Sequence, residues 1–206
     1  TGVLAVVLRM TASWSWTLIA SVGLSLPAVI LFEVTSQVVI DQIVAMVIDW
    51  SERTGNQSLG VTDPLRLERL LVGMVISGQI SVMLGTLALA RWWQSLLFNP
   101  GGFGKEFREL RLGPQMTLSL VAAMLVCYFG GIAYLSSWLL ILTIPFIFYG
   151  IGLTHWFVAK QQLGLNWLVV FYMMLLFFPQ FVAPLLLVFA FMDSLIGLRG
   201  QPFKGE

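Results

Sequence analysis

The chain has 206 residues, of which 58% are hydrophobic and 10% are charged, and its mean hydropathy is +0.90. Soluble domains carry about 25% charged residues, so this composition excludes an ordinary soluble domain and predicts that a lipid bilayer surrounds the protein. The formal net charge of +1 argues against a nucleic-acid partner, which would need a concentrated basic face.

Four long segments contain no Asp, Glu, Lys or Arg: residues 10–32, 70–90, 112–154 and 161–192. A helix needs roughly 20 apolar residues to cross a bilayer, and the last two segments are long enough for more than one crossing. The sequence therefore predicts an all-α, polytopic transmembrane helical bundle of about six or seven spans, forming one integral membrane domain over 1–206. Because the chain begins without Met or a signal peptide, we expect an N-terminally truncated fragment.

The first third of the chain predicts one complete span followed by a helix of another kind. Residues 12–33 form the span, which Pro27 is expected to kink. In residues 34–50 acids recur along one face, which is typical of an interfacial helix or of a span that lines a polar interior. Residues 51–69 are rich in turn residues and predict a polar loop, at whose end Asp63 caps the next helix.

That next helix is expected to run from Pro64 to about Arg91 and to be followed by a loop over 91–114. The loop begins with two tryptophans, which prefer the headgroup level, and it contains a short amphipathic stretch that predicts an interfacial helix. It also holds the densest Lys and Arg cluster beside any span. The positive-inside rule therefore places this loop in the cytoplasm.

The C-terminal half predicts four helices in two pairs. Residues 116–135 and 138–157 are expected to be antiparallel spans around a turn at Ser136–Ser137. The last apolar run is interrupted by PQFVAP, residues 179–184, whose two prolines remove two backbone donors. We expect it to form helices over about 166–178 and 183–198 and to return the C-terminus to the cytoplasm.

The stretch GGFGKE, residues 101–106, invites comparison with a phosphate-binding loop. It lacks the spacing of a Walker loop, the Ser or Thr after the Lys, and a preceding strand, so nucleotide hydrolysis is not predicted. A surface hinge is the simpler interpretation. The alternative is contact with lipid phosphates through nearby basic residues: Lys105, Arg108 and Arg111.

Small residues recur at every fourth position on two predicted spans, which places each set on one helix face. Such faces let helix backbones approach closely in a membrane. They are explained either by packing within this chain or by docking of another membrane subunit. The two sets are Ser13, Thr17, Ser21 and Ser25, and Gly73, Ser77, Ser81 and Gly85.

Polar residues at membrane depth are the candidates for function. The set comprises Glu33, Asp41, Gln180 and Asp193. Glu33 and Asp41 would need cationic partners or a water-filled cavity. Gln180 lies at the proline break, where half-helix ends could meet a solute, and Asp193 either has a role of its own or lies near the interface.

Chemistry-bearing residues are scarce otherwise. His155 is the only histidine and Cys127 the only cysteine, so no metal site and no internal disulfide can be defined. No arrangement of nucleophile and base is recognisable either. We therefore predict neither a cofactor nor an enzymatic activity.

The motif ARWWQSLLFNPGGFGKEFRELRLG, residues 90–113, resembles the YybS-like family of bacterial predicted multi-pass membrane proteins, a family defined as a domain of unknown function. That family is similar at fold level to the substrate-binding (S) subunits of energy-coupling-factor transporters, which dock on a partner through small residues of an early helix. The resemblance implies a helical bundle in a bacterial cytoplasmic (inner) membrane and a membrane partner. The Ser13–Ser25 face would match that docking helix.

The sequence thus favours a solute-binding or transport-associated membrane subunit with lipids, and another membrane subunit, as partners. The alternative is a non-transport membrane scaffold that binds lipids or partner membrane proteins. The small-molecule ligand is not identifiable from the sequence.

Overall fold

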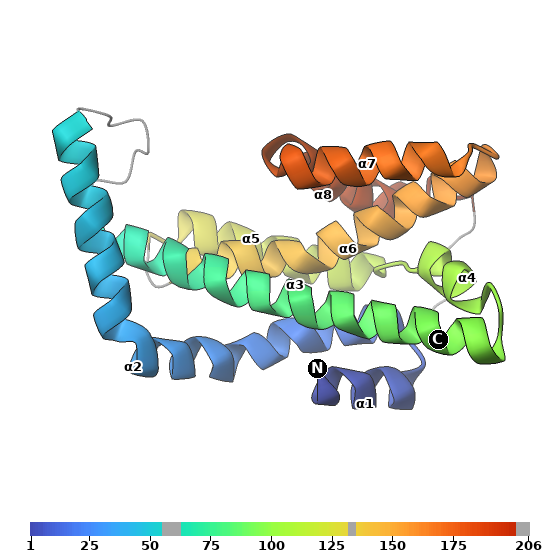
Figure 1. Cartoon of the computed structure of the whole chain (residues 1–206), viewed down its shortest axis with the longest axis horizontal. Helices are drawn as coiled ribbons and strands as arrows, with labels where there is room; N and C mark the ends of the chain where they lie inside the picture. Colours follow the sequence, from blue (N-terminus) through green and yellow to red (C-terminus); the bar gives the residue numbers. More distant parts are fainter. Residues whose placement is uncertain (55–62, 132–134, 201–206) are drawn as a thin grey trace.

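The computed structural model describes residues 1–54, 63–131 and 135–200. Every regular element in these ranges is a helix (Figure 1). The helices are α1 (Gly2–Thr11), α2 (Trp14–Thr54), α3 (Pro64–Phe98), α4 (Gly102–Glu109), α5 (Pro114–Phe129), α6 (Ser136–Lys160), α7 (Leu165–Phe177) and α8 (Pro179–Ile196). The all-α class is therefore confirmed.

Four helices in the described part of the chain are long and apolar enough to cross a membrane: α2, α3, α6 and α8. A fifth span results if α4 and α5, which meet at 62°, are counted together. These helices indicate a membrane-embedded protein. The expected six or seven spans are not confirmed, because α2 unites two expected helices and α7 has only 13 residues.

Helix α6 forms the centre of the bundle, since it packs against α2, α3, α4, α5, α7 and α8 (Figure 1). Its residues Ile141, Phe146 and Tyr149 are almost completely buried. Two glycines permit the closest approaches: a Cβ on Gly150 would lie 2.8 Å from Leu186 Cβ of α8, and one on Gly152 would lie 2.7 Å from the Phe107 carbonyl of α4. These contacts hold α8 and α4 against the same end of α6.

Helix α2 continues without interruption from Trp14 to Thr54, so the expected division at residue 33 is wrong. Pro27 lies inside the helix, where packing of the first half against the bundle offsets the lost backbone bond. Figure 1 shows α2 following the bundle and then bending sharply away from it near its middle. In the second half only Ile40 and Val44 are buried, which agrees with a helix that leaves the bundle.

Two expected loops are shorter than the sequence predicted. Residues 51–54 and 64–69 are helical, so the polar loop does not extend over 51–69; residues 55–62 lie outside the described part. Helix α3 continues through the tryptophans to Phe98, and the expected loop over 91–114 therefore begins only at Asn99. The short helix within it is present as α4, and Asp63 caps α3 by accepting a hydrogen bond from the Leu65 amide at 3.0 Å.

The C-terminal helices also differ from the prediction in their ends. Helix α5 ends at Phe129 because Gly130 and Gly131 follow, and Gly131 has a positive φ of 66°. Ser136–Ser137 is therefore the start of α6 rather than a turn. The division into α7 and α8 is confirmed, but it falls at Phe178. Pro179 begins α8, because the first helical position needs no backbone donor.

Candidate functional site: a buried ion pair beside a cavity

A completely buried ion pair stands at the end of α8. Asp193 lies in the last turn of that helix, and Gly197 then turns the chain in a left-handed conformation so that Arg199 comes back toward it. Arg199 Nη2 lies 2.7 Å and Nε 2.8 Å from Asp193 Oδ2, and the two side chains are 1% and 0% exposed. The Arg199 backbone amide also donates to Asp193 Oδ1 at 3.3 Å.

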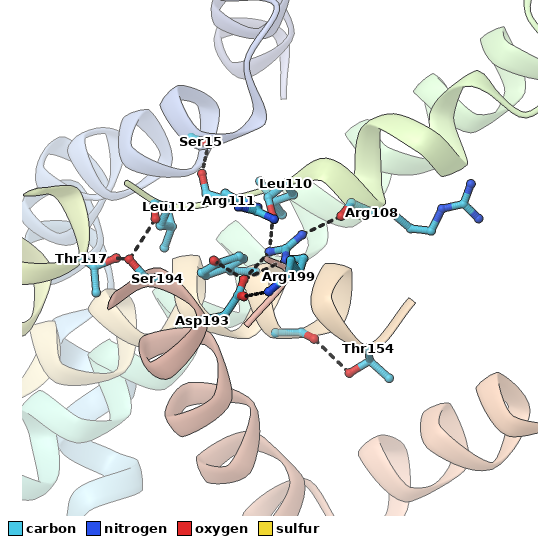
Figure 2. Close-up of polar contacts among 12 residues, drawn as sticks. Ser15, Arg108, Leu110, Arg111, Leu112, Thr117, Thr154, Asp193, Ser194 and Arg199 are labelled. Atoms are coloured by element: carbon cyan, nitrogen blue, oxygen red, sulfur yellow. Dashed lines mark hydrogen bonds and ion pairs between the residues drawn. The ribbon is translucent and has the colours of Figure 1, made fainter. Parts of the chain in front are cut away.

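Further donors of Arg199 bond to the end of α4 and to the segment that follows it (Figure 2). Nη1 donates to the Arg108 carbonyl at 2.6 Å, and Nη2 donates to the Leu110 carbonyl at 2.8 Å. Residues 110–113 are not helical, so their backbone groups need partners from elsewhere when they are buried. The guanidinium therefore fastens the end of α8 to this segment.

Tyr149 of α6 provides a further hydrogen bond to the Asp193 carboxylate. Its hydroxyl donates to Asp193 Oδ2 at 2.6 Å, and the Arg199 guanidinium lies 5.3 Å from the centre of its ring. Charge is expensive to bury unless it is paired and hydrogen-bonded. Here both charges meet that condition. The pair also joins three parts of the chain that are far apart in the sequence: the end of α8 with its following turn, α6, and the stretch from Arg108 to Leu110.

A chain of hydroxyl groups adjoins the pair. Ser194 Oγ donates to the Leu112 carbonyl at 2.9 Å and lies 2.6 Å from Thr117 Oγ1 of α5. Ser15 of α2 donates to the Arg111 carbonyl (Figure 2). The segment that links α4 and α5 is thus held by side chains from both α2 and α8.

A cavity of about 410 Å³ lies beside these groups. Its lining includes Tyr149, Asp193, Ser194 and the last turn of α8, together with Arg111 and Pro114. Asp193 and Arg111 are the charged residues among the described lining residues, and Asp193 is paired with Arg199. Pro114 is the first residue of α5, which has no side-chain cap, so the positive end of that helix dipole borders the cavity.

The sequence pointed to four polar residues at membrane depth, and the structure does not bring them together. Asp193 belongs to the buried pair. Glu33 pairs with Arg69 of α3, which also lies 3.5 Å from Glu68. Asp41 and Gln180 are exposed on α2 and α8, and neither lines the cavity described above.

The three basic residues considered for lipid contact have different positions. Lys105 is exposed on α4. The Arg108 carbonyl accepts a hydrogen bond from Arg199, while the Arg108 side chain extends away from the ion pair (Figure 2). Arg111 lines the cavity. Of the three, Arg111 alone joins the site.

The two small-residue faces have different surroundings. On α2, Thr17, Ser21 and Ser25 are at most 1% exposed and Ser13 is partly buried, so this face packs within the chain. On α3, Gly73 packs against Ser137 and Ser77 is partly buried. Ser81 and Gly85 are exposed, and a Cβ on Gly85 would meet nothing within 4 Å.

The sequence did not predict an aromatic cluster that side chains of α2, α4 and α6 form. Trp14 of α2 meets Phe103 and Phe107 of α4 edge-on, at 6.1 Å and 6.5 Å between ring centres. Phe107 meets the ring of His155, whose Nε2 lies 2.8 Å from the Tyr172 hydroxyl. This gives His155 a structural partner. The described residues hold no group of three His, Cys, Asp or Glu side chains placed to bind a metal ion.

A second, smaller cavity of about 160 Å³ lies between α2 and α3 near the bend of α2. Its walls are almost entirely apolar and include Phe32, Ile40 and Leu71. Ser36 is the one side chain of its described lining that carries a polar group, so the cavity has little with which to orient a polar ligand.

The sequence could have indicated part of the main site. Asp193 and Arg199 are six residues apart around Gly197, a spacing that a helix followed by a glycine cap can close. Nothing in the sequence pairs Tyr149 or the carbonyls of residues 108 and 110 with them, since these contacts arise only from the packing of α4, α6 and α8. No family model matches this chain, and no curated protein or solved structure is significantly similar to it.

Proposed function

We propose that this protein is a solute-binding or transport-associated subunit of a bacterial cytoplasmic membrane, and that the cavity beside Asp193 and Arg199 is its binding site. The observation that carries the proposal is the cavity itself: about 410 Å³, bordered by a buried ion pair, two hydroxyl-bearing side chains and Arg111. Binding sites in membrane proteins are concave, mostly apolar and supplied with a few fixed polar groups.

The distribution of cations supports a cytoplasmic position for this site. The ends of α3, α6 and α8 and the starts of α2 and α5 lie toward one end of the bundle, near α4 (Figure 1). The opposite end carries three cations, Arg53, Arg66 and Arg69. The site end carries Arg9, Arg91, Lys105, Arg108, Arg111, Lys160 and Arg199. By the positive-inside rule the site faces the cytoplasm.

The proposal includes membership of the YybS-like family, which rests on the motif in residues 90–113. Three parts of that motif have roles at the site: Phe107 in the aromatic cluster, the Leu110 carbonyl as an acceptor, and Arg111 in the lining. The motif therefore coincides with the segment that α2, α6 and α8 hold in place.

Native mass spectrometry of the full-length protein, released gently from its own membrane, tests this function. We expect a small molecule of reproducible mass to leave with the wild-type protein and to be lost from Ile196→Trp, which narrows the cavity. Val188→Trp is the matched control, because Val188 is equally a lipid-exposed residue of α8 but does not line the cavity. Equal ligand content in all three proteins would contradict the assignment of this cavity.

A second function, a membrane scaffold, is favoured by the exposed part of the small-residue face on α3. Ser81 and Gly85 would let another helix approach closely there. Under this proposal Ser81→Leu and Gly85→Leu release a co-purifying membrane protein while the ligand content of the cavity stays unchanged. The two functions are thus distinguished by their variants. A cavity variant that loses the bound small molecule supports the first function, and an α3-face variant that loses a co-purifying membrane protein supports the second.

A further inference from the structure

Helix α2 is longer than a membrane crossing requires. Its 41 residues have a length along the helix axis of about 60 Å, while the hydrocarbon core of a bilayer is about 30 Å thick. Figure 1 shows the first half of the helix lying along the bundle and the second half turned away from the bundle axis. The second half, residues 34–54, therefore has surroundings of its own.

An ion pair between two neighbouring helices marks where the hydrocarbon ends. Glu33 of α2 pairs with Arg69 of α3, so these two residues lie at the same level of the bundle. The charge-free segment 10–32 ends directly before Glu33, and the charge-free segment 70–90 begins directly after Arg69. Since charged groups are costly inside hydrocarbon, the pair stands at its boundary, and the second half of α2 begins at the headgroup level.

The second half of α2 stays near this level instead of continuing into water. The cavity of about 160 Å³ at the bend is lined by Val39 and Ile43 of α2 and by Leu71 and Val75 of α3. Leu71 and Val75 belong to the charge-free segment of α3, so they lie on the hydrocarbon side of Arg69. This part of α2 is thus held beside the outermost turns of a spanning helix, which a helix that projected outward along the bundle axis would leave behind.

Two faces of the second half differ in chemistry. One is formed by exposed apolar side chains at helical spacing: Val39, Ile43, Met46 and Trp50. On another face exposed residues recur at every fourth position and two of the three are acids: Asp41, Ala45 and Asp49. An amphipathic helix at the headgroup level buries its apolar face among acyl chains and leaves its polar face in water. Trp50 suits this position, because tryptophan prefers the membrane interface.

We propose that residues 34–54 form an amphipathic helix that lies on the membrane surface, with its apolar face among the acyl chains of lipids. This surface is at the end of the bundle opposite to Asp193 and Arg199, and the proposal does not depend on the ligand of the cavity beside that pair. Lipid is the partner that the position favours, because the apolar face shares its groove with Val75, whose side chain is 49% exposed on a spanning helix.

Bimane labels on two consecutive residues test the proposal. In a background that carries Cys127→Ser, Met46→Cys places the label on the apolar face and Ala45→Cys places it on the acidic face, although both residues are exposed in the chain itself. Each labelled full-length protein is incorporated into nanodiscs of brominated phosphatidylcholine, whose bromine atoms quench nearby fluorophores. We expect Met46→Cys to lose most of its fluorescence and Ala45→Cys to lose little.

The position of the bromine separates a surface helix from a span. Bromine near the headgroup should quench Met46→Cys more than bromine near the end of the acyl chain. The order should be reversed for Val82→Cys, the control at hydrocarbon depth, because Val82 is 64% exposed within the charge-free segment of α3. Size-exclusion chromatography of each labelled protein shows that the fold is retained.

Three results would overturn the proposal. Equal quenching of Ala45→Cys and Met46→Cys would show that the two faces have the same surroundings. Stronger quenching of Met46→Cys by the deep bromine would show that the second half of α2 crosses the membrane. If neither label is quenched, lipid does not cover the apolar face; protection of Met46→Cys from a water-soluble thiol reagent in permeabilised cells would then assign that face to a partner protein.

Discussion

Arg199 and Asp193 form a salt bridge of 2.7 Å in which neither side chain is more than 1% exposed. The pair is closed by a turn at Gly197 and is bonded to α6 through Tyr149, to the end of α4 through the Arg108 carbonyl, and to the segment before α5 through the Leu110 carbonyl. Buried pairs often add little stability over apolar residues, but removing one partner leaves an uncompensated charge. Asp193 and Arg199 therefore depend on each other, which gives a direct test.

Asp193→Asn should lower the free energy of unfolding by about 3–5 kcal/mol, because the Arg199 charge would remain buried without its counter-charge. Thermal or denaturant unfolding in detergent measures the effect. The double variant Asp193→Leu with Arg199→Met should recover a large part of the loss, because both buried charges are then removed.

The matched control for this pair is Arg53→Gln. Arg53 pairs with Asp49 at 2.9 Å, but the two side chains are 76% and 57% exposed. Exposed pairs contribute at most about 1 kcal/mol. If Asp193→Asn and Arg53→Gln changed stability equally, the first pair would not be buried as the structure has it.

Gly73→Ala should destabilise the bundle, because a Cβ there would lie 2.6 Å from the Ser137 carbonyl oxygen of α6. Overpacking of this kind typically costs about 1–3 kcal/mol. Gly85→Ala on the same helix is the control, since a Cβ at Gly85 meets nothing within 4 Å. Unfolding of the two variants in detergent decides the matter: the packing of α3 on α6 is refuted if Gly73→Ala unfolds at the wild-type temperature.

The helices themselves were largely predictable, because apolar runs free of charge and the caps at Asp63 and Pro64 are local signals. Their ends were less predictable. From the sequence, a helix boundary was expected at Glu33, where the acidic residues begin. Helix α2 continues past this point. Glu33 pairs with Arg69 of α3, and such a contact between helices is not visible in the sequence pattern of one helix. Likewise Pro179 began a helix where the pattern suggested a break, because a proline at the first helical position loses no bond.

The candidate site was predictable only in its parts. Asp193 and Arg111 were singled out for separate reasons, one as a charge at membrane depth and the other as a lipid contact. Their common position at one cavity depends on how α8 packs on α6 and on the segment before α5. Periodicity describes one helix at a time, so it contains no information about such contacts.

Cysteine labelling in sealed cells tests the orientation. In a Cys127→Ser background, Asn99→Cys between α3 and α4 should be protected from a membrane-impermeant reagent, because the proposed orientation puts the cation-rich end in the cytoplasm. Thr54→Cys, at the end of α2 and exposed, should react from outside. Reaction of Asn99→Cys from outside, with protection of Thr54→Cys, would invert the orientation and move the cavity to the opposite membrane face.

Glu33→Gln should lower stability more than Asp41→Asn, although both remove one acid from the same helix. Glu33 is bonded to Arg69, whose side chain is 7% exposed, and hydrogen bonds to charged groups contribute about 1.5–3 kcal/mol. Asp41 is exposed on the part of α2 that leaves the bundle, so its neutralisation should change the free energy of unfolding by less than about 0.5 kcal/mol. Parallel denaturant unfolding of both variants measures the difference. A larger effect of Asp41→Asn would show that the second half of α2 is covered by a partner, and the acids of that face would then be an interaction site rather than part of the helix surface.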